Sequence, residues 1–238
     1  ESMGAYDLSH YDGVLAYGKV LQELYETSGR VGQAWTWHEA ADTRVFVPPP
    51  AEPTEGGLVW IGNWGDGERT EELAEFLIQP ARTLRLKARV HGVRYPEEAR
   101  RALSEAGLEY AGWLPNFEVP RVFAQHSFTL HIPRRPYVRA LPGIPTIRPF
   151  EALACGIPLV CSPWEDAEGL FHPGRDFLIA RNGAEMTRHL RALQHDAALR
   201  RELSQHGLET IRARHTCAHR VDELLEIVRT LNGGNSTT

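Results

Sequence analysis

Arg148-Pro-Phe-Glu-Ala-Leu-Ala-Cys-Gly-Ile-Pro-Leu-Val-Cys-Ser-Pro163 is the stretch of this sequence that decides the fold. Pro149 suits the first position of a helix, where its missing N–H removes no helical hydrogen bond. Gly156 suits the position just past the helix end, where the backbone needs a positive φ. The apolar run 157–161 has the length of a fully buried strand. The stretch therefore predicts a short helix and a buried strand, with the helix N-terminus facing a crevice beside a sheet.

A helix N-terminus of this kind binds anions, because its first N–H groups have no acceptor within the helix. We expect Glu151 in the first turn, where its carboxylate can accept hydrogen bonds from ribose hydroxyls while the N–H groups hold a diphosphate. A glutamate there is also favoured by the helix dipole alone, by about 0.3–1 kcal/mol. The motif therefore predicts a nucleotide site, and a purely structural role for Glu151 stays open.

Composition limits the classes of protein to consider. With 238 residues the chain can form one large domain or two small ones, and 42% hydrophobic and 24% charged residues are ordinary globular values. The net charge of −5 argues against a general nucleic-acid-binding protein. Three cysteines are an odd number and indicate reduced thiols. Because neither a long apolar run nor a signal peptide is evident, we expect a cytoplasmic protein without a membrane span.

Strands and helices alternate along most of the chain. The predicted strands are 12–17, 31–37, 58–62, 84–91, 109–111, 128–132, 157–161 and 177–180, and the predicted helices outside the opening motif are 18–25, 69–79, 96–106, 119–125, 184–193, 198–212 and 217–231. Pro80 is expected to end helix 69–79, and the prolines at 48–50 predict a stiff linker. The alternation predicts an α/β fold with a doubly wound parallel sheet, whose ligands bind at the carboxyl ends of the strands.

Two further segments extend the opening motif: Ala-Asp-Thr-Arg-Val-Phe-Val-Pro at 41–48 and Phe-His-Pro-Gly-Arg-Asp-Phe at 171–177. With the Glu151 block they resemble the C-terminal, donor-binding half of a GT-B glycosyltransferase, and they are most similar to the CgeB-like spore-maturation branch. The resemblance covers about residues 12–230. It implies a bacterial hexosyltransferase that moves a sugar from a nucleotide-diphosphate sugar to an acceptor that the sequence does not identify.

The resemblance also divides the chain. It implies that 1–50 is a remnant of an N-terminal domain with the interdomain linker, that 51–215 is the Rossmann-like domain binding the nucleotide sugar, and that 216–238 is a C-terminal helix and tail. The rest of the N-terminal domain is then the expected partner. The apolar stripe of the terminal helix makes a homodimer a further expectation.

The resemblance implies specific donor contacts. Glu151 is expected to bind the ribose, and the chain just before it to bind the diphosphate. The loop after strand 58–62 is expected to face the phosphates or the sugar, and the loop from residue 113 the base. His91 and Arg94, which follow the next strand, are weaker candidates, because a lone histidine is more often structural. The expected donor-binding residues are thus Asn63, Trp64, His91, Arg94, Trp113, Leu114, Pro115, Thr146, Ile147, Arg148 and Glu151.

Departures from the family pattern keep alternatives open. Many retaining members carry a first glutamate eight residues before the second, and here that position is Gly143. The retaining class, although expected, therefore rests on an incomplete motif. Because the N-terminal domain is a remnant, the chain could be a nucleotide-binding module that is inactive without a partner domain. A nucleotide-sugar epimerase of similar shape is the other alternative. His215, Cys217 and His219 match no common zinc spacing, so no bound metal is expected.

Overall fold

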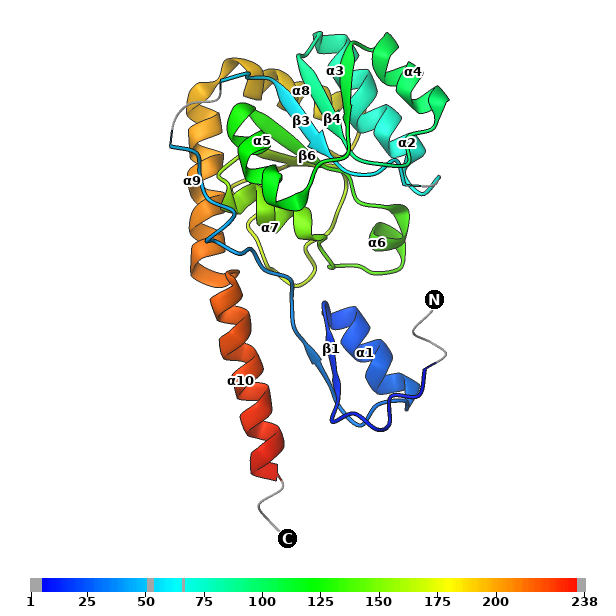
Figure 1. Ribbon diagram of the computed structural model, residues 1–238, viewed down its shortest axis with the longest axis vertical. Coiled ribbons are helices and arrows are strands. Elements are labelled where there is room, and N and C mark those ends of the chain that lie inside the picture. The colour runs from blue at the N-terminus through cyan, green and yellow to red at the C-terminus, as the bar shows by residue number, and fades with distance from the viewer. Residues whose placement is uncertain (1–5, 51–53, 66, 235–238) are drawn as a thin grey trace.

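The computed structural model describes residues 6–50, 54–65 and 67–234. Its main body is a six-stranded parallel sheet between two layers of helices (Figure 1). The strands are β3 (Leu58–Ile61), β4 (Ala88–His91), β5 (Leu108–Gly112), β6 (Phe128–His131), β7 (Leu159–Cys161) and β8 (Leu178–Ile179). Their order is β5-β4-β3-β6-β7-β8, so the predicted doubly wound parallel sheet is confirmed. The direction of strand addition reverses between β3 and β6, which is where such sheets bind ligands.

Side chains alternate in direction along the buried strands, so successive residues pack into two separate apolar cores. Leu58 and Trp60 of β3 face one core, and Val59 and Ile61 face the other. The first core lies under α2 (Thr70–Leu73), the π-helical segment Ala74–Ile78, α3 (Gln79–Leu84), α4 (Glu97–Glu105) and α8 (Gly183–His195). The second lies under α5 (Val119–Gln125), α7 (Ile147–Ala154) and α9 (Ala197–Arg214). Burial on both faces explains why the strands are short continuous apolar runs.

A small unit at the N-terminal end stands apart from this sheet. Strands β1 (Val14–Ala16) and β2 (Ala34–Thr36) pair in parallel around α1 (Lys19–Ser28). The last helix, α10 (Cys217–Gly234), leaves the main body and runs towards this unit (Figure 1). Trp37 Nε1 donates to the Arg220 carbonyl at 2.8 Å, which ties the connection after β2 to α10. We refer to residues 6–36 as the N-terminal unit.

The prediction that Pro80 ends a helix was wrong. The helix continues from Thr70 to Leu84, and Pro80 lies in the first turn of α3. A π-helical segment at Ala74–Ile78 precedes it. Its wider turn shifts the hydrogen-bond register, so the proline ring avoids the carbonyl that it meets in a regular α-helix. The following strand accordingly begins at Ala88 rather than at residue 84.

The decisive helix also starts earlier than its sequence suggested. Helix α7 begins at Ile147, with Thr146 as its N-cap residue, so Pro149 is the third helical residue and Glu151 the fifth. A proline at the third position is tolerated, because N–H groups of the first turn have no helical acceptor. The prediction that Glu151 lies in the first turn was therefore wrong. Gly156 has the expected positive φ, 64°.

Two further points concern connections and ends. The connection before α7 contains a short helix, α6 (Arg135–Arg139). Residues 235–238, the end of the expected C-terminal tail, lie outside the described residues. Within the described ranges, no helix is both long and apolar enough to cross a membrane.

Candidate functional site

A cleft of about 520 Å³ opens at the carboxyl ends of β3, β4 and β6. Its walls are the ends of these strands, the connections that follow β3, β5 and β6, and the first turn of α7. This is the edge of the sheet where the strand order reverses. The cleft thus lies where the topology predicts a ligand site.

Three arginines line the cleft: Arg69, Arg134 and Arg148. Among the described residues that line it, none carries a carboxylate. The Arg69 guanidinium lies over the Trp60 ring, 5.3 Å from its centre. Burial, together with the charges of Arg134 and Arg148, lowers the pKa of Arg69 to about 10. Two of these cations are paired outside the lining, Arg134 with Glu68 at 3.1 Å and Arg148 with Glu151 at 2.6 Å. The three guanidinium groups still line the cleft without a lining carboxylate, which favours an anionic ligand there.

Backbone carbonyls hold Arg69 in place. Its Nε and Nη2 donate to the Asn63 carbonyl at 3.1 and 2.7 Å, and its Nη1 donates to the Ile132 carbonyl at 2.9 Å. The side chain therefore fastens the connection after β3 to the end of β6. Because these acceptors are neutral, the charge of Arg69 is not cancelled by an ion pair in these contacts, and it remains available to a ligand.

Glu151 lies behind the wall of the cleft rather than in it. Its Oε2 accepts from Arg148 Nη1 at 2.6 Å, and its Oε1 accepts from Asn116 Nδ2 at 3.0 Å. The residue is 2% exposed. Burial raises its pKa, and Arg148 and Asn116 offset part of that rise. In this arrangement the carboxylate fixes the position of Arg148, which itself lines the cleft.

The predicted donor-binding residues fall into two groups. Those lining the cleft are Asn63, Trp113, Leu114, Thr146, Ile147 and Arg148. Those outside its lining are Glu151, Trp64, His91, Arg94 and Pro115. The structure thus brings together six of the predicted residues at one cleft.

The predicted residues outside the cleft lining lie in different surroundings. Trp64 packs against Tyr95, with ring centres 5.5 Å apart. His91 is 7% exposed, neither ring nitrogen has a partner among the described groups, and burial lowers its pKa. Arg94 is exposed, with φ of 60°. Pro115 precedes the 3-10 turn Asn116–Glu118.

Sequence reasoning missed four residues that shape the site: Arg69, His131, Asn116 and Glu39. Arg69 lies between a glycine-rich loop and a helix, a position that could have suggested a phosphate contact. His131 ends the buried strand β6, where a polar residue interrupts an apolar run. Asn116 and Glu39 carry no local signal, because each acts through a partner distant in sequence, Glu151.

Glu39 lies in the connection between β2 and the main body. Its Oε2 is buried and has no hydrogen-bond partner among the described groups. Burial and the charge of Glu151 raise its pKa to about 7. The folded protein therefore binds this proton more tightly than the unfolded chain, whose value is near 4.5. The resulting stabilisation is complete below pH 4.5 and is lost as the pH rises to about 7.

We expect the free energy of unfolding to fall by about 1 kcal/mol more between pH 5 and 8 in the wild type than in Glu39→Gln, after allowance for the exposed part of the side chain. Urea unfolding at the two pH values measures this difference. Glu226→Gln, which changes a carboxylate that is 70% exposed, is the matched control and should unfold as the wild type does. Equal pH dependence in wild type and Glu39→Gln would rule out this role of Glu39.

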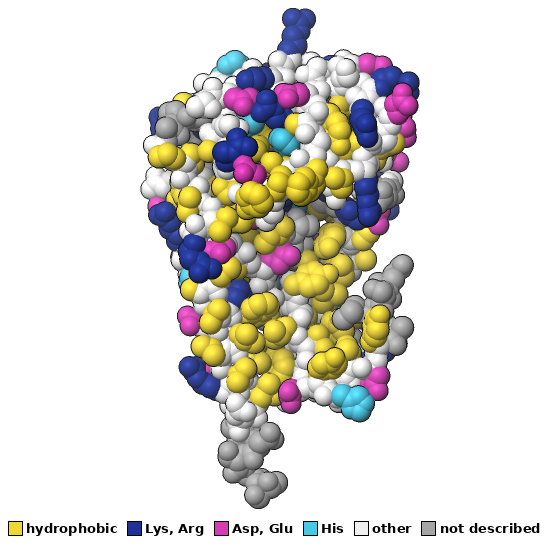
Figure 2. Space-filling view, viewed as in Figure 1, with side chains coloured by type: hydrophobic (Ala, Val, Ile, Leu, Met, Phe, Trp, Pro, Cys, Tyr) yellow, Lys and Arg dark blue, Asp and Glu magenta, His cyan; other side chains and the backbone are white. Residues whose placement is uncertain are grey.

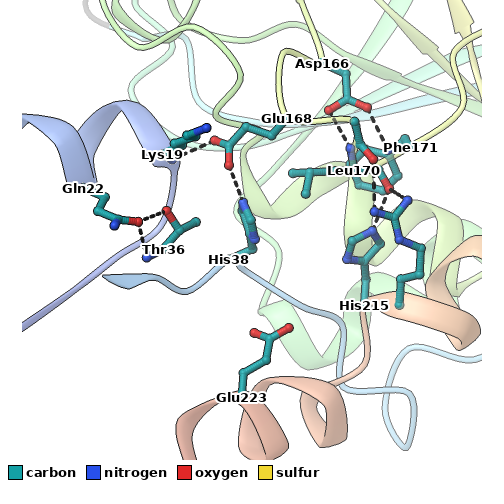
Figure 3. A network of polar contacts seen from close by, with 12 residues as sticks. Lys19, Gln22, Thr36, His38, Asp166, Glu168, Leu170, Phe171, His215 and Glu223 are labelled. Carbon is teal, nitrogen blue, oxygen red and sulfur yellow. Dashed lines mark hydrogen bonds and ion pairs between the residues drawn. The ribbon is translucent and has the colours of Figure 1, made fainter. Parts of the chain in front are cut away.

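A second carboxylate, Glu168, joins the N-terminal unit to the main body (Figure 3). Its Oε1 accepts from the Lys19 N–H at the start of α1, at 2.8 Å. Its Oε2 lies 2.7 Å from His38 Nε2. The same figure shows Gln22 of α1 bonded to Thr36 of β2, within the N-terminal unit. The connection after β7 thus orients the N-terminal unit.

No group of three or more potential metal ligands occurs among the described residues. His215 Nε2 donates to the Leu170 carbonyl at 2.7 Å, and His219 Nδ1 lies 2.6 Å from the Thr216 hydroxyl. His215 therefore contacts the connection after β7, and His219 contacts the residue just before α10.

A family model described as "Glycosyl transferase-like" matches residues 69–226. The chain belongs to this glycosyl transferase-like family. The match begins at Arg69, covers the cleft walls contributed by β4, β5, β6 and α7, and extends into α10. A search of curated protein sequences gives no match.

Solved structures share the fold of this glycosyl transferase-like chain. Alr3699/HepE of Anabaena, solved with UDP and glucose, has a TM-score of 0.71 at 14% identity over 92% of this chain and 63% of its own. Sucrose-phosphate synthase of Thermosynechococcus elongatus has a TM-score of 0.68 at 16% identity, over 93% and 58%. The C-terminal domain of LpcC, a group 1 glycosyl transferase of Francisella tularensis, has a TM-score of 0.57 at 17% identity, over 74% and 99%.

These likenesses establish that the glycosyl transferase-like chain has the Rossmann-like fold of GT-B glycosyltransferases. The chain spans about three fifths of the length of the first two relatives, at 63% and 58%. It contains nearly all of the LpcC C-terminal domain, at 99%.

Proposed function

We propose that this chain is the donor-binding half of a glycosyltransferase and that its cleft holds a nucleotide-diphosphate sugar. The observation that carries the proposal is that Arg69, Arg134 and Arg148 line one cleft together with the first turn of α7. That turn offers the N–H groups of Ile147 and Arg148, which have no acceptor within the helix. Backbone N–H groups and guanidinium groups together suit the two phosphates of such a donor.

We assign each part of the donor to different residues of the cleft. Thr146, Ile147 and Arg148 surround the diphosphate, with Asn63 facing the phosphates or the sugar. Trp113 and Leu114 lie at the side of the cleft formed by the connection after β5, where we place the base. The exposed fraction of Trp113, 70%, leaves its ring available for stacking. The relative Alr3699/HepE, solved with UDP and glucose, supports a uridine donor among the candidates.

Glu151 has a conditional role in this scheme. In the structure Arg148 occupies its Oε2, so the carboxylate reaches ribose hydroxyls only when the diphosphate draws Arg148 towards itself. Binding of the diphosphate then exposes the acceptor that recognises the ribose. Two steps of recognition are thus coupled through one ion pair, Arg148–Glu151.

The cleft residues assist transfer mainly through electrostatics. When the bond between sugar and diphosphate breaks, negative charge grows on the departing phosphate oxygen. Fixed guanidinium and N–H groups stabilise that charge without reorganising. A retaining outcome and a place in the CgeB-like branch belong to this proposal on the strength of the sequence motif alone.

Exposed apolar side chains on the N-terminal unit and on α10 fit a partner that completes the acceptor side. They include Leu15, Tyr17, Leu24, Val221, Leu225 and Val228. Figure 2 shows hydrophobic side chains gathered on the lower part of the same view. We propose that further sequence of an N-terminal domain, or a second copy of the chain, covers this surface. The division at residues 50 and 215 belongs to the same proposal.

Calorimetric titration with UDP, GDP, TDP, ADP and CDP tests the donor site. We expect one diphosphate to bind the wild type, and Glu151→Ala to weaken that binding about tenfold, or about 1.4 kcal/mol. Glu226→Ala, which removes a glutamate from an exposed pair on α10, is the control and should bind as the wild type does. If no diphosphate binds at millimolar concentration, the donor-site proposal is wrong. Binding without sugar transfer to any acceptor or to water identifies a binding module.

A further inference from the structure

The hydroxyl of Thr146 is not used by the helix that it precedes. A threonine at the N-cap position ordinarily accepts a hydrogen bond from the N–H of the second or third helical residue. Thr146 makes no such side-chain bond to α7. The third helical residue is Pro149, which has no N–H to donate. The start of α7 therefore keeps the Thr146 hydroxyl available for other partners.

A buried histidine takes this hydroxyl instead. His131, the last residue of β6, is 3% exposed, and its Nε2 lies 3.1 Å from Thr146 Oγ1. Its Nδ1 is buried and has no partner among the described groups. The charged groups acting on the ring are Arg69, before α2, and Arg148, in α7. Burial, with these two charges, lowers the pKa of His131 to about 3, so the ring is neutral at physiological pH.

The surroundings decide which ring nitrogen carries the single proton. A proton on Nδ1 would leave a buried N–H without an acceptor, and such orphaned donors are rare in proteins. A proton on Nε2 is donated to Thr146 Oγ1 and leaves only an unpaired acceptor at Nδ1, a less severe loss. The second tautomer is therefore favoured. With Oγ1 acting as acceptor towards His131, the hydroxyl proton of Thr146 is free to point into the cleft, which Thr146 lines.

We propose that His131 is a positioning residue: its Nε2–H donates to Thr146 Oγ1 and directs the Thr146 hydroxyl proton to a phosphate oxygen of the bound nucleoside diphosphate. This inference rests on the proposed function, because it requires the diphosphate to lie against the first turn of α7. Thr146 then contributes a directed donor beside the guanidinium of Arg148. His131 also belongs to the cleft lining, but its side chain is buried and its Nδ1 is enclosed, so we assign its effect to Thr146 and treat it as a positioning residue.

A double-mutant cycle tests the linkage, with the tightest-binding of UDP, GDP, TDP, ADP and CDP as the probe. Thr146→Val and His131→Leu should each weaken binding about tenfold, since a hydrogen bond to a charged group is lost or misdirected. The double variant should bind no more weakly than Thr146→Val alone, because in this proposal His131 affects the ligand through the Thr146 hydroxyl. His131→Gln, whose amide N–H can replace Nε2–H, should restore most of the affinity.

A matched control and a ligand-free readout complete the experiment. Thr187→Val removes a hydroxyl that donates to the Gly183 carbonyl on α8, away from the cleft, and should leave binding unchanged. In ¹⁵N NMR of the wild type, the signals lost in His131→Gln should show a neutral ring protonated at Nε2. A ring protonated at Nδ1, or additive losses in the double variant, would overturn the inference while leaving the proposed function intact. If none of the five diphosphates binds the wild type, both are overturned.

Discussion

Arg148→Ala is expected to abolish detectable nucleoside diphosphate binding and to lower the free energy of unfolding by about 3 kcal/mol. The substitution leaves Glu151, whose side chain is 3% exposed, without its 2.6 Å partner. A buried carboxylate without a cation is costly, because desolvation is no longer offset by an opposite charge. Since Arg148 also lines the cleft, affinity and stability should fall together. Calorimetry and urea unfolding at pH 7 measure the two losses.

The double variant Arg148→Met with Glu151→Leu separates these effects. It removes both charges, so stability should recover much of the loss while binding stays absent. Arg188→Ala is the matched control, because Arg188 pairs with Glu185 three residues away and is 67% exposed. It should change neither quantity by more than about 0.5 kcal/mol. Retained diphosphate binding in Arg148→Ala would contradict the placement of the phosphates.

Gly92→Ala is expected to lower the free energy of unfolding by about 3 kcal/mol or more. Gly92 has φ of 151°, and a Cβ there would lie 2.0 Å from the Gly62 carbonyl oxygen. The Gly62 carbonyl is backbone, and the added Cβ would be fixed directly to the Gly92 backbone. Neither group can rotate away as the end of a long side chain could. The strand ends would have to separate, which would also displace the neighbouring Asn63 in the cleft wall. Thermal and urea unfolding should both report the loss.

Gly107→Ala provides the comparison for this prediction. Gly107 also has a positive φ, 78°, but a Cβ there meets no atom within 4 Å. Its substitution should therefore cost only the left-handed backbone penalty, about 1–2 kcal/mol. Equal losses in the two variants would show that the contact between Gly92 and Gly62 does not limit stability.

The sheet was predictable because its strands are buried on both faces. Runs such as Leu58–Ile61 and Leu159–Cys161 are apolar throughout, and helical segments separate them. Helix boundaries were harder where two local rules competed. Pro80 normally ends a helix, but the π-helical turn before it removes the clash. Pro149 suggested a first helical position, yet α7 starts two residues earlier, at Ile147, and the proline is accommodated because N–H groups of the first turn need no helical acceptor.

The site was predictable only as far as it follows from strand ends. Thr146, Ile147 and Arg148 precede a recognisable buried strand, and the structure places them at the cleft. The contacts of Glu151 with Asn116, and of His131 with Thr146, join residues 35 and 15 positions apart. Such pairs depend on how the connections fold over the sheet, so no local sequence pattern predicts them.

The isolated bridge between Ala41 and Thr216 has a mechanical consequence. The Ala41 N–H donates to the His215 carbonyl, and the Cys217 N–H donates to the Ala41 carbonyl, so two backbones leave the main body side by side. The connection after β2 and the start of α10 are therefore joined at one point, so a displacement of one at this bridge is transmitted to the other. Cys217 is the exposed thiol beside this bridge, whereas Cys155 and Cys161 are buried. A thiol-reactive dye would therefore attach beside the bridge and report changes in its surroundings without any engineered cysteine.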